Sequence, residues 1–149
     1  MSNEISMKQI LVPLDGSDSC FVAAKRAVIL AKMAKAELIF MHAVVNLPYV
    51  EYESAGLARV QYIDEAKRHA EMWYMNAGDM ASKEDVKFST ETVLNVASIA
   101  NSIVNYAESK NVDLIVMGTK GRTGIKRFLL GSVASGVVAH AKCSVLVVR

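Results

Sequence analysis

The sequence predicts an α/β protein built on one doubly wound parallel sheet of five strands, in the order 3-2-1-4-5, with helices on both faces. Five short apolar runs, each suited to a buried strand, alternate with four segments whose apolar residues recur every three or four positions. Such alternation is typical of a parallel sheet that is covered on both faces. The chain has 149 residues, of which 52% are hydrophobic and 21% charged. We therefore expect residues 1–149 to form a single domain with one well-buried core.

The first half of the chain supplies two strands and two helices. The apolar run Lys8–Leu14 predicts the first strand, and Asp18 or Ser19 can cap the helix that follows it. Glu37–Val45 predicts the second strand, and Asn46–Ser54 reads as a loop. A long amphipathic helix is then indicated by apolar residues at helical spacing, namely Leu57, Val60, Ile63, Ala66, Ala70, Trp73 and Ala77.

The second half supplies the other three strands and two helices. Val86–Val93 alternates as a strand, Asp113–Met117 predicts the fourth strand, and Ser144–Val148 predicts a closing strand. The segment Ser132–Ala141 is rich in small residues and predicts the last helix. The third helix is indicated by Val96, Ala100, Ile103, Val104 and Ala107.

A basic, glycine-rich loop follows the predicted fourth strand, and Gly131 and Ser132 then open the last helix. Glycines let the backbone approach an anion, and the N-terminus of a helix points free N–H groups at it. Lysines and arginines add opposite charge. This layout is typical of a phosphate-binding site. The glycines and cations of the loop are Gly118, Lys120, Gly121, Arg122, Gly124, Lys126 and Arg127.

The order of the strands predicts where this loop lies. Open parallel sheets bind ligands beyond the carboxyl ends of their strands, where the connections switch from one face to the other. In the order 3-2-1-4-5 the first and fourth strands are neighbours at that point. We therefore expect the turn Pro13–Ser17, which follows the first strand, to line one crevice with the glycine-rich loop.

Charge and composition exclude several classes of protein. The formal net charge is +2, but residues 114–149 hold six Lys or Arg and no Asp or Glu. A near-neutral total argues against general nucleic-acid binding. No apolar run is long enough to span a membrane. Cys20 and Cys143 are far apart in sequence, which favours a reduced, cytoplasmic protein. His42, His69 and His140 are scattered, so we interpret them as structural residues and expect no metal ligand among them.

With these residues in view, the chain resembles the universal stress protein family over essentially its whole length. Ile10–Ser17 resembles the family's first strand and acidic loop, and His42–Val44 resembles the end of its second strand. Cys143–Val148 resembles its closing strand. The spacing of the ATP-binding branch is matched residue for residue by Gly118-x2-Gly121-x9-Gly131-Ser132.

The resemblance implies a role for each matching position. The turn after the first strand and the end of the second strand would hold the nucleoside, with backbone groups reading adenine. The end of the fourth strand would flank the sugar, and the loop and last helix would hold the phosphates. Two positions depart from the family pattern, because Ala43 replaces a usual Val and Ala134 replaces a frequent hydroxyl residue. The implied nucleotide-binding residues are Pro13, Asp15, Ala43, Met117, Gly118, Gly121, Arg122, Gly131, Ser132 and Val133.

The function implied is that of an ATP-binding regulatory module in a stress response, with slow or no hydrolysis, no catalytic residue and an unidentified protein partner. Magnesium would be held mostly by phosphate oxygens and water. One alternative is an ATP pyrophosphatase or adenylyl-transferring enzyme, but those carry Ser-Gly-Gly-x-Asp-Ser where Leu14–Ser19 misses the first two positions. A second alternative is a relative that has lost nucleotide binding and acts through protein contacts.

The closing strand Ser144–Val148 predicts a homodimer. It would be an edge strand, and it is apolar on both faces. It has no Lys or Pro that would discourage pairing with another strand. A two-fold partner that offers the same strand would satisfy the open edge. The family resemblance implies the same association.

Overall fold

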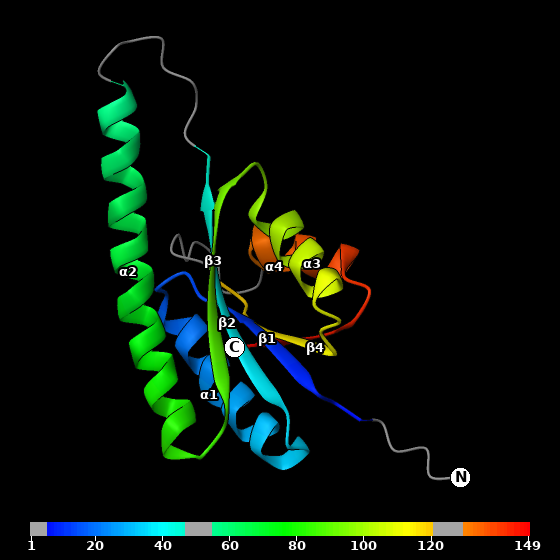
Figure 1. Ribbon diagram of the computed structural model, residues 1–149. Helices are drawn as coiled ribbons and strands as arrows, with labels where there is room; N and C mark the ends of the chain where they lie inside the picture. Colours follow the sequence, from blue (N-terminus) through cyan, green and yellow to red (C-terminus); the bar gives the residue numbers. More distant parts are fainter. Residues whose placement is uncertain (1–5, 47–54, 121–129) are drawn as a thin grey trace.

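The computed structural model describes residues 6–46, 55–120 and 130–149, which form five strands alternating with four helices (Figure 1). The loop predicted over Asn46–Ser54 falls almost entirely outside these residues. None of the helices within the described ranges is both long enough and apolar enough to cross a membrane. The elements are β1 Gln9–Pro13, α1 Asp18–Ala34, β2 Glu37–Val45, α2 Ala55–Lys83, β3 Phe88–Val96, α3 Ile99–Ser109, β4 Leu114–Gly118, α4 Ser132–His140 and β5 Ser144–Val148.

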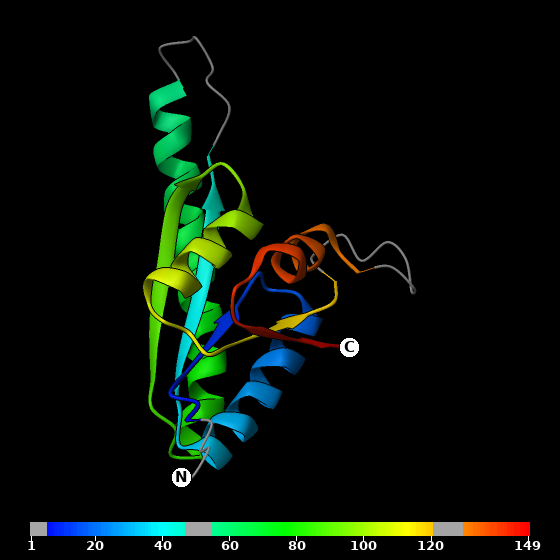
Figure 2. The same ribbon diagram turned by 90° about the vertical axis from the view of Figure 1, so that its right-hand side faces the viewer.

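All five strands join one sheet in the order β3-β2-β1-β4-β5, and every pairing is parallel. This confirms the predicted fold class and strand order. Helices α1 and α2 cover one face, and α3 and α4 cover the other (Figures 1 and 2). The two edges of the sheet are β3 and β5.

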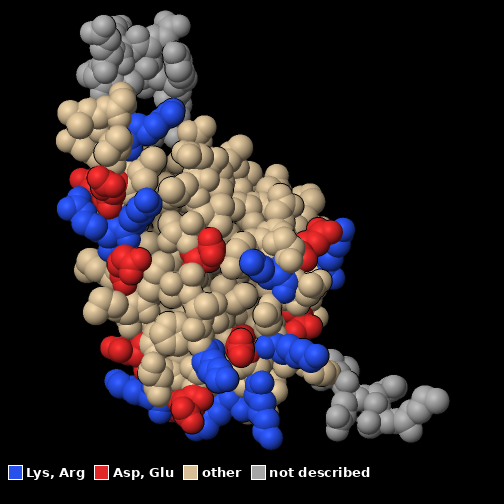
Figure 3. Space-filling model, viewed as in Figure 1, with Lys and Arg blue, Asp and Glu red and all other residues tan. Residues whose placement is uncertain are grey.

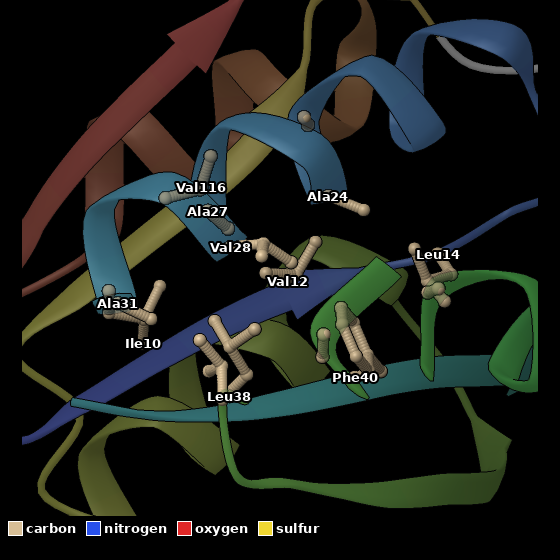
Figure 4. Close-up of a cluster of buried hydrophobic side chains, with 14 of the residues drawn as sticks. Ile10, Val12, Leu14, Ala24, Ala27, Val28, Ala31, Leu38, Phe40 and Val116 are labelled. Atoms are coloured by element: carbon tan, nitrogen blue, oxygen red, sulfur yellow. The ribbon is translucent and has the colours of Figure 1, made fainter. Parts of the chain in front are cut away.

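The strands are buried on both faces because alternate residues serve two separate cores. On the α1 and α2 side, Ile10, Val12 and Phe40 are fully buried against small residues of α1 (Figure 4). The alanines of α1 lie on one face of the helix, so its backbone can approach the sheet closely. The α1 residues that do this are Ala23, Ala24, Ala27, Val28 and Ala31.

The core on the α3 and α4 side uses the residues in between. Leu11, Ile115 and Met117 pack there against Ile103 of α3 and Val137 of α4. The central strands are therefore continuous apolar segments in the sequence, as expected for parallel strands that are buried on both faces. Each layer of helices rests on its own core, and the sheet separates the two.

Several boundaries differ from the sequence prediction, most of them by one residue, as at the ends of β1, β4 and α4. Ser17, and neither Asp18 nor Ser19, caps α1, because its Oγ accepts a hydrogen bond from the Cys20 amide at 3.3 Å. The third strand begins later and runs further than Val86–Val93. Val96 consequently ends β3 and does not belong to the following helix.

The cap of α3 explains that last shift. Ser98 stands in an extended conformation, and its Oγ accepts a hydrogen bond from the Asn101 amide at 3.3 Å, so the helix starts at Ile99. The pairing of β2 with β3 also slips by one residue between Ala43 and Val45, where Asn95 takes a φ of 57°. A bulge of this kind bends a strand near its end, and here it does so beside the end of β2.

Candidate functional site: a cavity at the carboxyl ends of the strands

A cavity of about 500 Å³ opens at the carboxyl ends of β1, β2 and β4. Its volume falls in the range of sites for small organic ligands. It lies where the connection after β1 goes to one face of the sheet and the connection after β4 goes to the other, as expected for this topology. The turn before α1, the end of β4 and the start of α4 all contribute to its lining.

Every predicted nucleotide-binding residue that the structure describes lies in the wall of this cavity. Gly121 and Arg122 fall outside the described residues. The other eight come from four separate parts of the chain that folding brings together. They are Pro13, Asp15, Ala43, Met117, Gly118, Gly131, Ser132 and Val133.

The turn after β1 is held by hydrogen bonds around Asp15. Its Oδ1 accepts from the Ser17 amide at 2.9 Å and from the Ser17 Oγ at 2.5 Å. Between them Gly16 has a φ of +82°, which side chains rarely allow, and a Cβ there would overlap the indole of Trp73. The conformation of the turn therefore requires glycine at position 16, and Trp73 of α2 packs directly against it.

The end of β4 lies against the start of α1. A Cβ on Gly118 would come within 2.9 Å of the Ser19 carbonyl carbon and would also overlap its Oγ. Ser19 Oγ in turn donates a hydrogen bond to the Lys120 carbonyl at 2.6 Å. Gly118 thus has a packing role as well as its predicted place beside a ligand.

The start of α4 faces the same cavity. The Gly131 amide donates to the Thr119 carbonyl at 2.8 Å, so this N–H is already engaged and differs from the predicted phosphate donor. Ser132 and Val133 follow in the first helical turn, where amides have no acceptor within the helix. Ser135 Oγ donates to the Leu130 carbonyl at 3.3 Å and does not line the cavity, so it does not replace the hydroxyl absent at Ala134.

Helix α2 forms a further wall that sequence reasoning missed. Tyr62, Glu65, Ala66, His69 and Trp73 all line the cavity. Tyr62, Ala66, His69 and Trp73 are spaced three or four residues apart, which puts them on one stripe of the helix, and Glu65 adjoins Ala66. The periodicity was visible in the sequence, but nothing local showed that this part of the stripe faces a cavity instead of the core.

The aromatic and imidazole rings of this wall are in contact. The rings of His42 and Trp73 meet edge to face with centroids 4.9 Å apart, and those of His69 and Trp73 are stacked at 6.0 Å. His42 Nδ1 lies 2.7 Å from the Leu14 carbonyl, which can only accept, so Nδ1 carries the proton. His42 therefore has a structural hydrogen bond, as interpreted from sequence, and it also lines the cavity.

The cavity holds no metal-binding cluster within the described ranges, where no group of three or more His, Cys, Asp or Glu could hold an ion. The one cysteine in its wall, Cys20, is buried, and burial raises the pKa of its thiol. A protonated thiol is a poor nucleophile at neutral pH.

Charged side chains are spread over the face shown in Figure 3, including near its middle and on its right-hand side. Many of them lie along α2 and at the lower end of the molecule, which Figure 1 identifies as the end opposite the carboxyl ends of the strands. Lys32 of α1 and Glu84 form an exposed ion pair with 2.6 Å between Nζ and Oε2. Within the cavity wall, the described charged residues are Asp15, Glu65 and Lys120.

The family model described as "Universal stress protein family" matches residues 7–149. The chain belongs to this family. A curated relative, the universal stress protein MJ0531 of Methanocaldococcus jannaschii, is 42% identical over 143 residues, covering 95% of this chain and 82% of the relative. The membership agrees with the resemblance identified from the glycine spacing.

Solved structures of universal stress proteins share the fold. UspA from Lactobacillus plantarum superposes with a TM-score of 0.83 at 28% identity, covering 96% of this chain and 98% of that one. A universal stress protein in complex with cAMP superposes with a TM-score of 0.64 at 26% identity, covering 97% and 98%.

Proposed function

We propose that this universal stress protein binds ATP in the cavity at the carboxyl ends of β1, β2 and β4, and acts as a nucleotide-dependent regulatory module. The observation that carries the proposal is the convergence on one cavity of eight residues whose role the family resemblance implies. A related protein of the family was solved with cAMP, which supports an adenine nucleotide as the ligand class.

The lining suggests how the parts of a nucleotide would be distributed. The base would lie beside the backbone at Ala43, on the α3 and α4 side, with Met117 next to the sugar. The phosphates would lie at the start of α4, beside Ser132, Val133 and Lys120. Helix amides and a lysine both favour negative charge there. Any Mg²⁺ would be carried by the phosphates.

We propose slow or no hydrolysis as part of this function. An efficient phosphoryl transfer needs a group that orients the attacking water beside the terminal phosphate. The described carboxylates in the wall are Asp15, whose Oδ1 is engaged with Ser17, and Glu65 on the α2 side. Neither lies at the start of α4, where the phosphates are proposed to bind.

Titration calorimetry with ATP and GTP tests the proposed ligand. We expect ATP to bind and GTP to bind at least about tenfold more weakly, because backbone groups at the end of β2 match the donor and acceptor pattern of the adenine edge. Equal affinities, or no heat with ATP at millimolar concentration, would contradict the proposal.

The variant Gly131→Val separates loss of the site from loss of the fold. Its φ of −57° suits valine, and the amide that donates to Thr119 is retained. The added side chain would crowd the start of α4, so we expect ATP binding to be abolished while the circular dichroism spectrum is unchanged. Arg122→Ala should weaken binding by about 1–2 kcal/mol, because one charge-assisted hydrogen bond is lost.

We also propose that residues 1–149 act as one unit and that two copies associate through β5. The family model matches the chain in one continuous stretch, which supports a single unit. The edge position of β5 and the partial exposure of its apolar side chains support the dimer.

A further inference from the structure

The wall of the cavity comes from both faces of the sheet. Ala43 and Met117 belong to the core on the α3 and α4 side. His42 is the strand neighbour of Ala43, and alternation directs its side chain to the opposite face. There it meets Trp73 of α2, which packs against the other core. The proposed nucleotide contacts the side of the cavity that holds Ala43 and Met117. No part of the nucleotide has been assigned to the side formed by α2.

The second side is built from a regular stripe of α2. Tyr62, Ala66, His69 and Trp73 follow one another at intervals of four, three and four residues, so they lie along one line of the helix. The small Ala66 lies between the two ring-bearing residues Tyr62 and His69. The stripe thus presents aromatic surface on either side of a short side chain.

Glu65 adds a charge of defined sign to this stripe. Glu65 lines the cavity beside Ala66 on the α2 wall, whereas the start of α4 lies on the side of the other core. A phosphate would be attracted to the α4 side and repelled by Glu65. A flat ring with N–H groups would instead find aromatic faces to stack on and an oxygen that accepts its hydrogen bond.

We propose that the stripe Tyr62–Trp73 of α2 is a second subsite, which binds a planar nitrogen heterocycle with N–H donors while the nucleotide occupies the other side. This rests on the proposed function, since the nucleotide fills the first side. The ring is either free or joined to the nucleotide through its phosphates. A metal ion does not fit, because the described residues hold no cluster of three ligands. A purely apolar ligand would leave Glu65 and His69 without hydrogen-bonding partners from it.

Trp73 is the single tryptophan of the chain and lines this subsite, so its fluorescence can detect a ligand bound there. In the first experiment, adenosine is titrated into the full chain saturated with ATP, and Trp73 fluorescence is recorded. We expect a saturable change in emission, which identifies a free ring as ligand. In the second, the affinities for ATP and for diadenosine tetraphosphate are compared by calorimetry. A gain of about tenfold for the two-base probe, well above the statistical factor of two, identifies a tethered ring.

A matched pair of variants assigns either effect to the stripe. Glu65→Gln removes the charged acceptor and keeps its shape, so it should weaken the adenosine response, or the gain of the two-base probe, about fivefold or more. Glu71→Gln makes the same change at an exposed position six residues further along α2, outside the cavity wall, and should alter neither.

Three results would overturn the inference. If ATP binds but adenosine gives no saturable response and the two-base probe gains nothing, the second subsite is refuted while the proposed function stands. If Glu65→Gln and Glu71→Gln behave alike, the stripe is not the site. If ATP itself does not bind, the proposed function fails and the subsite fails with it.

Discussion

Gly118 shows that a residue named for its place beside a ligand can be needed for packing as well. Its backbone lies so close to Ser19 that an added Cβ would come within 2.9 Å of main-chain and side-chain carbons. The Ser19 backbone belongs to the first turn of α1 and cannot move without disturbing the cap at Ser17. Glycine is therefore required at this position whether or not a ligand is bound.

We expect Gly118→Ala to lower the free energy of unfolding by about 1–3 kcal/mol, because the methyl group overpacks a rigid contact. Urea denaturation of the protein without nucleotide measures this. Gly56→Ala is the control, since no atom lies within 4 Å of a Cβ there and alanine favours the helix by about 0.5–1 kcal/mol. Equal stabilities for the two variants would show that the contact at Gly118 is not tight.

At this scale the sequence pointed to the described ends of the loops that line the cavity, but not to its α2 wall. Asp15, Gly118 and Ser132 follow strands or open helices, so local spacing identified them. Trp73 lies more than fifty residues from Gly16, yet its ring fills the space that a side chain at Gly16 would need. Only the packing of α2 over the turn reveals that relation.

Among the elements, α2 is tied to the edge strand β3 by one buried hydroxyl group. Tyr74 donates a hydrogen bond to the Glu91 carbonyl at 2.6 Å, and its oxygen lies 2.8 Å from Thr92 Oγ1. Burial raises the pKa of Tyr74 to about 12. In the unfolded chain the same group titrates near its ordinary value of about 10.

The raised pKa predicts how stability depends on pH. The contribution of the Tyr74 hydroxyl is fully present below about pH 10 and is lost as the pH rises through about 12, because the folded state resists losing this proton. Tyr74→Phe should cost about 1–2 kcal/mol at neutral pH, since two hydrogen bonds are lost. Above pH 10 the difference between wild type and variant should shrink, as measured by urea denaturation at a series of pH values. A difference that stays constant from pH 8 to pH 12 would contradict this origin.

The elements themselves were predictable because their periodicity is strong, and their ends were less so. Glu37–Val45 and Ser144–Val148 agree with the structure at both ends. The start of α1 was missed by one residue because several neighbouring side chains could cap it, and only Ser17 is placed to bond the Cys20 amide. Val96 fitted a helical pattern, but the cap at Ser98 comes after it.

For the whole molecule, the two edges of the sheet differ in chemistry. Strand β3 carries Ser89, Thr90 and Glu91, and polar or charged side chains discourage pairing with another chain. Strand β5 is apolar apart from its first residue, and Leu146 is 39% exposed. This difference supports β5, and not β3, as the surface of the proposed dimer.

We expect the wild-type chain to scatter light as a dimer, at twice the chain mass of 16.2 kDa. Leu146→Lys should give a monomer, because a charge at the centre of the edge would be buried in the interface. Leu57→Lys is the matched control, since Leu57 is an exposed apolar residue of α2 and its replacement should leave the dimer intact. A wild-type chain that runs as a monomer at micromolar concentration would contradict the proposal.

The cavity draws its wall from α2 on one side of the sheet and from α4 on the other, and each of these layers packs on its own core. A molecule that touched both walls would connect α2 to α4 across the carboxyl ends of the strands. Local opening of either layer would then break contacts to the same molecule, so the two openings would become linked. When such a molecule is bound, we therefore expect amide hydrogen exchange to slow in α2 and in α4 together.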